Sequence, residues 1–173
     1  MNKIGDIKNY TLIDKNYKYL IYLIFCIAAF FRFYNINYEN LWIDEIISFW
    51  VANPNISFKE TLIRHNSLEQ VPILFNAILK IYFNIFSYNY SISRYLVAIL
   101  SLLSFFVSFL IIKEVSKKKS VILFFTYLLA INIYLIKFSL ELRVYSLVVL
   151  LTSLSILLFI KALKKDSKIY YFL

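Results

Sequence analysis

"YLVAILSLLSFFVSFLII", residues 95–112, runs without a single charged side chain. A helix rises by about 1.5 Å per residue, so it needs about 20 mostly apolar residues to cross the hydrocarbon core of a bilayer, with about 17 as the practical minimum. Helices of soluble domains expose one face to water and therefore seldom contain an uncharged run of this length. The stretch therefore predicts a helix that spans a membrane.

Three further runs of the same kind lie on either side of it, at Tyr19–Phe31, Val121–Ile136 and Val144–Ile160. The chain is 61% hydrophobic and only 17% charged, which is more apolar than a typical soluble domain. Bulky aromatic residues, and not a small-residue cleavage site, follow the first run, which favours a retained signal anchor. The predicted fold class is all-α: a polytopic membrane protein with about four transmembrane helices.

The charged residues predict how the chain threads through the membrane. Twelve lysines and four acids precede the first run, separate the second from the third, or follow the fourth; the rest of the chain holds seven basic and six acidic residues. Basic segments stay in the cytoplasm. We therefore expect a multi-pass protein of the cell (inner) membrane with a cytoplasmic tail at 1–18 and an outer loop at 35–94. The net charge of +9 orients the chain and predicts no nucleic-acid partner.

Two short helices are predicted in the outer loop. Residues 56–66 form an amphipathic pattern in which Ser57 is a suitable N-cap and Glu60 stands in the capping-box position. Residues 72–86 begin with a proline, which favours a helix start. This second helix has one polar stripe, which predicts a juxtamembrane helix with the stripe facing water: Asn76, Lys80 and Asn84.

Two other polar features are interpreted structurally. Ser101, Ser104 and Ser108 recur at helical spacing and predict the close approach of another helix. The single histidine, His65, lies in the amphipathic pattern of the outer loop and is expected to be a surface residue without a role. Neither feature is assigned any chemistry.

The outer segments also carry a pattern of acids and bases that suggests chemistry. "NLWIDEIISFW", residues 40–50, sets Asp44 and Glu45 among apolar and aromatic side chains, and "KFSLELRVYS", residues 137–146, contains Glu141 and Arg143. A carboxylate can take the proton of a hydroxyl nucleophile, and a guanidinium suits a phosphate group. Together they suggest transfer from a lipid phosphate or pyrophosphate. The plain alternatives are solvated loop acids and a basic residue that anchors a helix end.

Four stretches resemble one family in the same order. "LWIDEIISFW" resembles the first outer-loop motif of membrane glycosyltransferases of the GT-C class, in the branch of the protein O-mannosyltransferases and lipid A aminoarabinose transferases. "SLEQVPILFNAIL", "YSISRYLVAILSLLSFFVSFLIIKEVSKKK" and "FSLELRVYSLVVLLTSLSILLFIKAL" are similar to the stretches that follow in that branch. The resemblance implies that residues 1–173 form one N-terminal transmembrane module of a longer enzyme.

The resemblance also implies roles for particular residues. Asp44 would be the catalytic base that activates the acceptor hydroxyl, and Glu45 would support its geometry or bind the acceptor. Three residues would bind substrate around the same cavity: Glu69, Glu141 and Arg143. The donor would be a sugar on a polyprenyl phosphate, and the acceptor a protein, lipid or glycan. No cofactor and no metal are implied, and membrane lipid is the expected environment.

A different class of function also fits the composition. The chain could be a small non-catalytic membrane protein, or a truncated remnant, that acts as a structural partner subunit. A transporter is a weaker fit, because no predicted span carries an acid or a Pro/Gly break that would line a pathway. The sequence that follows Leu173 in the source genome would discriminate between the enzyme and the structural subunit.

Overall fold

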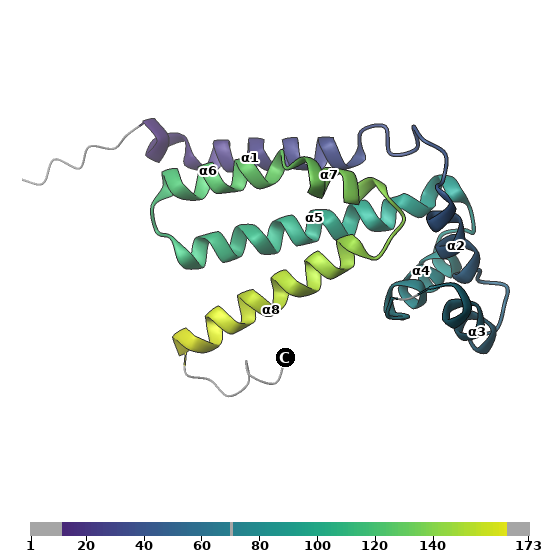
Figure 1. Ribbon diagram of the computed structural model, residues 1–173. Coiled ribbons are helices and arrows are strands. Elements are labelled where there is room, and N and C mark those ends of the chain that lie inside the picture. The colour runs from purple at the N-terminus through teal and green to yellow at the C-terminus, as the bar shows by residue number, and fades with distance from the viewer. Residues whose placement is uncertain (1–11, 70, 166–173) are drawn as a thin grey trace, which may run out of the picture.

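The protein is helical throughout the residues that its computed structural model describes, 12–69 and 71–165, and these residues contain no strand. In chain order the helices are α1 (Leu12–Phe33), α2 (Ile43–Val51), α3 (Phe58–Leu68), α4 (Leu74–Ile85), α5 (Tyr90–Val115), α6 (Lys119–Ala130), α7 (Ile133–Leu140) and α8 (Tyr145–Lys165). Figure 1 shows α1, α5, α6, α7 and α8 as a lengthwise bundle, with α2, α3 and α4 gathered at one end. The predicted all-α class is confirmed.

Three helices are long and apolar enough to cross a membrane: Asn16–Phe33, Tyr90–Val115 and Tyr145–Lys164. The pair α6 and α7 passes the same test only when both helices are counted as one span, and the two are bent by 44°. By length and composition the described residues thus offer three spans, or four with the bent pair. The four apolar runs of the sequence all fall in these helices.

The apolar composition of the third run predicts one continuous helix. In the structure this helix is broken after Ala130. The side chain of Asn132 accepts a hydrogen bond from the Leu135 amide at 3.0 Å, which caps the start of α7. The Ala130 carbonyl at the end of α6 accepts a hydrogen bond from Arg32 Nη1 at 3.4 Å. Both ends of the break therefore find polar partners, although the apolar pattern runs through it.

Serines line the contacts of α5. Ser101 and Ser104 are buried, and Ser108 Oγ lies 3.4 Å from Ser153 Oγ of α8. Within the bundle, α5 packs most extensively on α8. The small side chains let the helix backbones approach, so the prediction drawn from the serine spacing is confirmed.

Arg32 is fully buried near the end of α1 and links three helices. Its Nε donates to Ser101 Oγ of α5 at 3.0 Å, and its Nη1 donates to the Ala28 carbonyl of α1 at 3.0 Å as well as to Ala130 of α6. The guanidinium also lies 5.3 Å from the centre of the Phe105 ring. Hydrogen bonds and an aromatic ring, and not a carboxylate, surround this charge, and Arg32 Nη2 is buried without a hydrogen-bond partner among the described residues.

The short helices α3 and α4 confirm part of the sequence prediction and correct part of it. Ser57 caps α3 by accepting a hydrogen bond from the Glu60 amide, but the Glu60 carboxylate pairs with Arg64 at 3.0 Å and does not close a capping box. The expectation that the polar stripe of α4 faces water holds for Asn84, which is exposed, and was wrong for the other two residues. Asn76 is buried, and Lys80 Nζ donates to the backbone carbonyls of Asn53 and Ile56.

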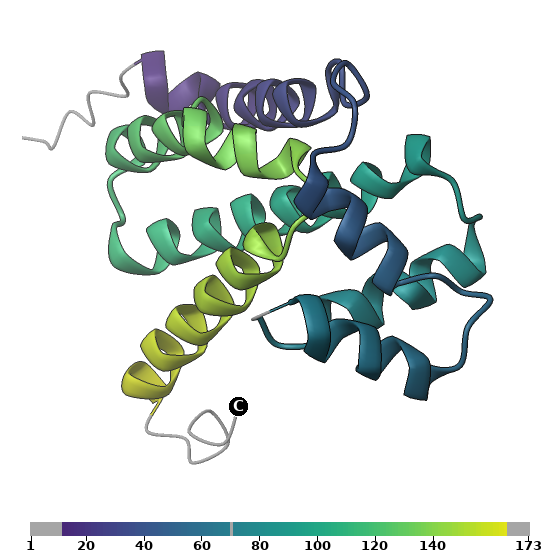
Figure 2. The same ribbon diagram turned by 45° about the vertical axis from the view of Figure 1, so that its right-hand side comes forward.

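An apolar cluster fastens these short helices to the bundle. Side chains from α4 and from the residue after α2 pack against side chains from α5, the α7–α8 turn and α8: Ala52, Phe75, Leu79, Phe83, Val97, Leu100, Leu142 and Leu147. Phe49 of α2 packs against this cluster. Figure 2 shows α2 between the bundle and the helices α3 and α4. Because the cluster is shared, residues of the outer loop and of the α7–α8 turn are held in fixed relation to each other.

Candidate functional site

A buried ion pair joins α2 to α5 at the centre of this junction. The Glu45 carboxylate accepts hydrogen bonds from Arg94 Nε at 2.9 Å and from Arg94 Nη2 at 2.7 Å. Its oxygens also accept the backbone amides of Trp42 at 2.9 Å and Leu142 at 2.6 Å. Burial by itself would raise the pKa of Glu45, but the hydrogen bonds from Arg94, Leu142 and Trp42 outweigh burial and lower the pKa. Glu45 is therefore held as a carboxylate.

Arg94 uses all five of its N–H groups. Besides the two bonds to Glu45, its Nη1 donates to the carbonyls of Ile36 and Glu39, at 3.2 and 2.7 Å, and its Nη2 donates to the carbonyl of Asn40 at 3.2 Å. The pair thereby ties the α1–α2 loop, α2, α5 and the α7–α8 turn together. The Glu45 oxygens have no acceptor capacity left for a substrate. Of the two roles implied for Glu45, this geometry favours support of the site.

Three of the other candidate residues come together at a second place along α2. Arg143 Nη1 donates to the Asp44 backbone carbonyl at 3.2 Å and to both Glu69 oxygens, at 3.3 and 3.4 Å. Glu69 Oε1 also accepts the Ser48 hydroxyl at 2.9 Å. Three separate stretches of sequence thus meet here: α2, the end of α3 and the α7–α8 turn. We call their residues the Arg143 cluster: Asp44, Ser48, Glu69 and Arg143.

The Arg143 cluster retains unused polar groups. Arg143 Nε is buried without a hydrogen-bond partner, and within the described residues no partner is recorded for the Asp44 carboxylate, which is exposed in the first turn of α2. An unpaired buried donor costs about 1–3 kcal/mol, so its presence calls for an explanation. The guanidinium of Arg143 thus has a spare donor, and it contacts the backbone of the residue that carries the exposed Asp44 carboxylate.

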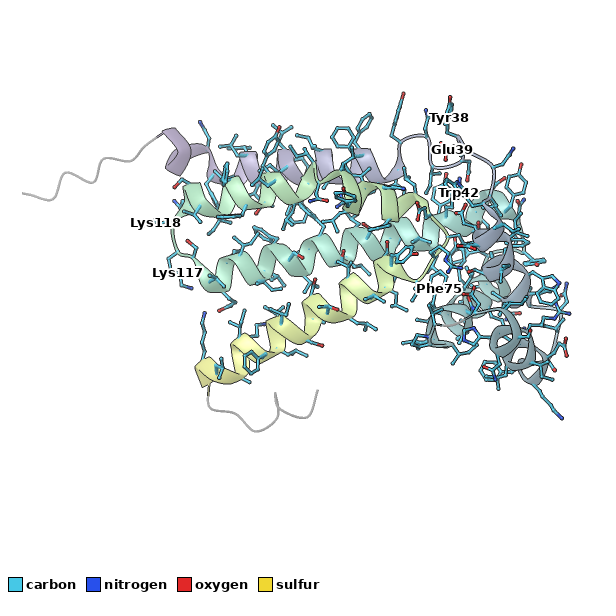
Figure 3. All side chains as sticks on the ribbon, in the orientation of Figure 1. Tyr38, Glu39, Trp42, Phe75, Lys117 and Lys118 are labelled. Atoms are coloured by element: carbon cyan, nitrogen blue, oxygen red, sulfur yellow. The ribbon has the colours of Figure 1, made fainter. Side chains whose placement is uncertain are left out.

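Glu141 does not join this cluster. Its Oε1 lies 3.7 Å from Lys137 Nζ, and both residues line a cavity of about 670 Å³ between the end of α1, the α1–α2 loop and α7. Figure 3 shows Tyr38, Glu39 and Trp42, which also line this cavity, at the end of the bundle opposite Lys117 and Lys118. The five predicted residues are thus distributed over three places: the Arg143 cluster, the Glu45–Arg94 pair and this cavity.

His65 is buried, contrary to the expectation of a surface residue. Its Nε2 lies 2.7 Å from the Val71 carbonyl, which can only accept, so Nε2 carries the proton; its Nδ1 then accepts from Asn76 Nδ2 at 3.0 Å. The histidine therefore braces the turn that carries Glu69 against α4. Its partner Asn76 comes from the very stripe that the sequence pattern assigned to water.

The described residues contain no group of three or more His, Cys, Asp and Glu side chains that would hold a metal ion. Comparison of the chain with models of known protein families, with curated proteins and with solved structures found no match. A function is therefore inferred from the chemistry of the Arg143 cluster.

Proposed function

We propose that residues 1–173 form the N-terminal transmembrane module of a glycosyltransferase of the cell membrane. It moves a sugar from a polyprenyl-phosphate donor to the hydroxyl of an acceptor protein, lipid or glycan on the outer face. In this proposal α1, α5, the α6–α7 pair and α8 cross the membrane, and α2, α3 and α4 lie at its outer surface with α4 juxtamembrane. The N-terminus is cytoplasmic.

The observation that carries the proposal is the Arg143 cluster. The Asp44 carboxylate would accept the proton of the acceptor hydroxyl as its oxygen bonds to the anomeric carbon. The bond between that carbon and the phosphate oxygen would break with inversion, and polyprenyl phosphate would leave as an anion. The unpaired Nε of Arg143 and the charge of its guanidinium suit the phosphate at this step. Glu69 holds the guanidinium in place from its other edge.

The distribution of charge supports the proposed placement. Lysines gather at the end of the bundle away from α2, α3 and α4, at the close of α5, in the α5–α6 connection and late in α8: Lys113, Lys117, Lys118, Lys119, Lys161 and Lys164. The Arg143 cluster lies at the other end, where acids and bases are nearly balanced. This polarity is the one expected when the lysine end faces the cytoplasm.

Lipid binding provides the first test, because the phosphate is common to every donor of this class. The purified protein in detergent is titrated with undecaprenyl phosphate and, separately, with undecaprenol, and bound lipid is counted by native mass spectrometry. We expect Arg143→Ala to weaken undecaprenyl phosphate binding by roughly tenfold or more, as for loss of a charged hydrogen-bonding partner. Arg64→Ala, an arginine of α3 that lies over Trp50, is the matched control. Equal binding of undecaprenol and undecaprenyl phosphate would overturn the proposed anion site.

Transfer provides the second test. Membranes that contain the protein are incubated with labelled polyprenyl phosphate mannose, glucose and aminoarabinose, and loss of label from the lipid fraction is followed. Asp44→Asn should slow transfer by about 10²–10⁴-fold, the usual contribution of a general base, while the amount of inserted protein stays the same. Near-parental transfer by Asp44→Asn would remove this residue from the reaction. If the longer enzyme that contains residues 1–173 consumes none of the donors, the result counts against sugar transfer and favours the non-catalytic subunit.

A further inference from the structure

The cavity that contains Glu141 and Lys137 plays no part in the proposed sugar transfer. It lies between the last turn of α1, the α1–α2 loop and α7. One wall is lined by the apolar side chains of Phe31, Ile133, Ile136 and Leu140. Polar and aromatic side chains line the rest: Tyr34, Tyr38, Glu39, Trp42, Lys137 and Glu141. A cavity with an apolar wall and charged groups beside it suits an amphiphile.

The loop that forms one wall is fixed in advance. Arg94 binds three of its carbonyl groups, and Asn37 Nδ2 donates to the Ser91 carbonyl at 2.8 Å. Asn35 adopts a positive φ of 53°, a left-handed conformation that asparagine tolerates better than most residues. A ligand would therefore meet a preformed wall and would not have to order it, which favours binding.

The charged lining favours a headgroup with both a cation and an anion. No hydrogen bond or ion pair is recorded for the Glu39 carboxylate among the described residues, and Glu141 is paired only at 3.7 Å. The rings of Tyr34, Tyr38 and Trp42 are 59%, 82% and 61% exposed. Aromatic faces together with a carboxylate are the groups that bind an ammonium ion. Lys137, 62% exposed in its side chain, is the nearby cation for a phosphate.

We propose that this cavity binds a zwitterionic phospholipid whose headgroup ends in a primary ammonium. The ammonium lies against Glu39 and the aromatic rings, the phosphate lies beside Lys137, and one acyl chain follows the apolar wall of α1 and α7. Arg94 also lines the cavity but is already paired with Glu45, so Glu39 and Glu141 face Lys137 as the one remaining cation, and an anionic headgroup is disfavoured. The inference rests on the proposed membrane placement of the bundle and is independent of sugar transfer.

Tryptophan fluorescence tests it, since Trp42 lines the cavity and the chain has only one other tryptophan, Trp50. A Trp50→Phe protein is reconstituted in phosphatidylglycerol vesicles that contain a fixed minor fraction of acyl-brominated lipid. The brominated lipid is phosphatidylethanolamine, phosphatidylcholine or phosphatidylglycerol. We expect phosphatidylethanolamine to quench Trp42 most strongly, with an association at least roughly threefold tighter than that of phosphatidylglycerol.

Matched variants connect the preference to the cavity. Glu39→Gln should abolish the preference, whereas Glu60→Gln, an exposed acid on α3 outside the cavity, should keep it. Equal quenching by phosphatidylethanolamine and phosphatidylglycerol in the parent, or an unchanged preference in Glu39→Gln, would overturn the headgroup site. Failure of every brominated lipid to quench Trp42 would overturn the membrane placement as well. Neither result would bear on undecaprenyl phosphate binding at Arg143.

Discussion

Glu45 and Arg94 illustrate at the scale of single residues how a charge is made tolerable in an apolar junction. Each is almost completely buried, and each has all of its hydrogen-bonding capacity satisfied by the partner and by backbone groups. A buried ion pair is not in itself strongly stabilising, because both ions have lost their hydration. Removing one partner is different, since the remaining charge then has no compensation. The pair therefore holds α2, α5 and the α7–α8 turn in fixed positions relative to one another.

The stability of single and double variants should reflect this. Arg94→Met leaves Glu45 buried and unpaired and should lower the free energy of unfolding by about 3–5 kcal/mol. Glu45→Gln combined with Arg94→Met should recover part of that loss, because no lone charge remains. Unfolding of the detergent-solubilised protein, followed by tryptophan fluorescence against added denaturant, gives the values. Losses that simply add in the double variant would show that the two side chains are not coupled.

The pH dependence of stability has a definite sign. The pKa of Glu45 is lower in the folded protein than its ordinary value of 4.5, so below neutrality the unfolded chain takes up the proton first. The stabilisation is complete well above that ordinary value and is lost as the pH falls through the folded-state pKa. We expect the melting temperature to drop on acidification in the parent and to drop less in Glu45→Gln. An identical acid dependence in both proteins would assign the effect to other groups.

At the scale of elements, the short helices α2 and α4 have apolar side chains on the outside. Ile43, Ile46 and Trp50 lie exposed along one face of α2, and Leu74, Ile81 and Ile85 lie exposed along one face of α4. The opposite face of α4 is occupied by the contacts of Phe75, Asn76 and Leu79. At about 1.5 Å per residue, a helix of 12 residues is far shorter than the roughly 30 Å hydrocarbon core. The exposed faces therefore favour contact with a membrane surface.

Depth measurements along α4 test this. Spin labels at Leu74, Ile81 and Ile85 in reconstituted protein should report similar shallow depths, because the helix lies in the plane of the interface. A label at Asn84, outside this apolar face, serves as the comparison and should be more accessible to water. A depth that increases steadily from Leu74 to Ile85 would instead show that α4 crosses the bilayer.

The elements also show which parts of the fold were predictable. Long uncharged runs predicted α1, α5 and α8 because their length alone requires a helix in a membrane, and the Ser57 cap depends only on local residues. The break after Ala130 was not predicted, because one asparagine that caps a new helix hardly changes the apolar composition of the run. The burial of Asn76 and His65 and the inward position of Lys80 were missed because their partners lie in other parts of the chain.

The candidate site was predictable only in part for the same reason. Asp44, Glu69 and Arg143 were singled out through motifs, and the structure brings them together. No sequence pattern paired Glu45 with Arg94, which are 49 positions apart, or placed Glu141 at a separate cavity. Tertiary packing of the α7–α8 turn against α2 decides both.

At the scale of the whole molecule, charge is polarised along the bundle, with Lys117 and Lys118 at one end and Glu39 and the α2–α4 helices at the other. The positive-inside rule converts this polarity into a topology in which the α5–α6 connection is cytoplasmic and α3 is outside. Single cysteines placed at the two ends test it in a Cys26→Ser background, since Cys26 is the only native cysteine. Asn66→Cys in α3 and Ser116→Cys after α5 are both neutral changes that leave the charge pattern intact. An impermeant maleimide should label Asn66→Cys in intact cells, whereas Ser116→Cys should react only after the membrane is permeabilised.

Labelling of Ser116→Cys in intact cells would place the lysine end outside. The Arg143 cluster would then face the cytoplasm, away from any donor presented at the outer surface.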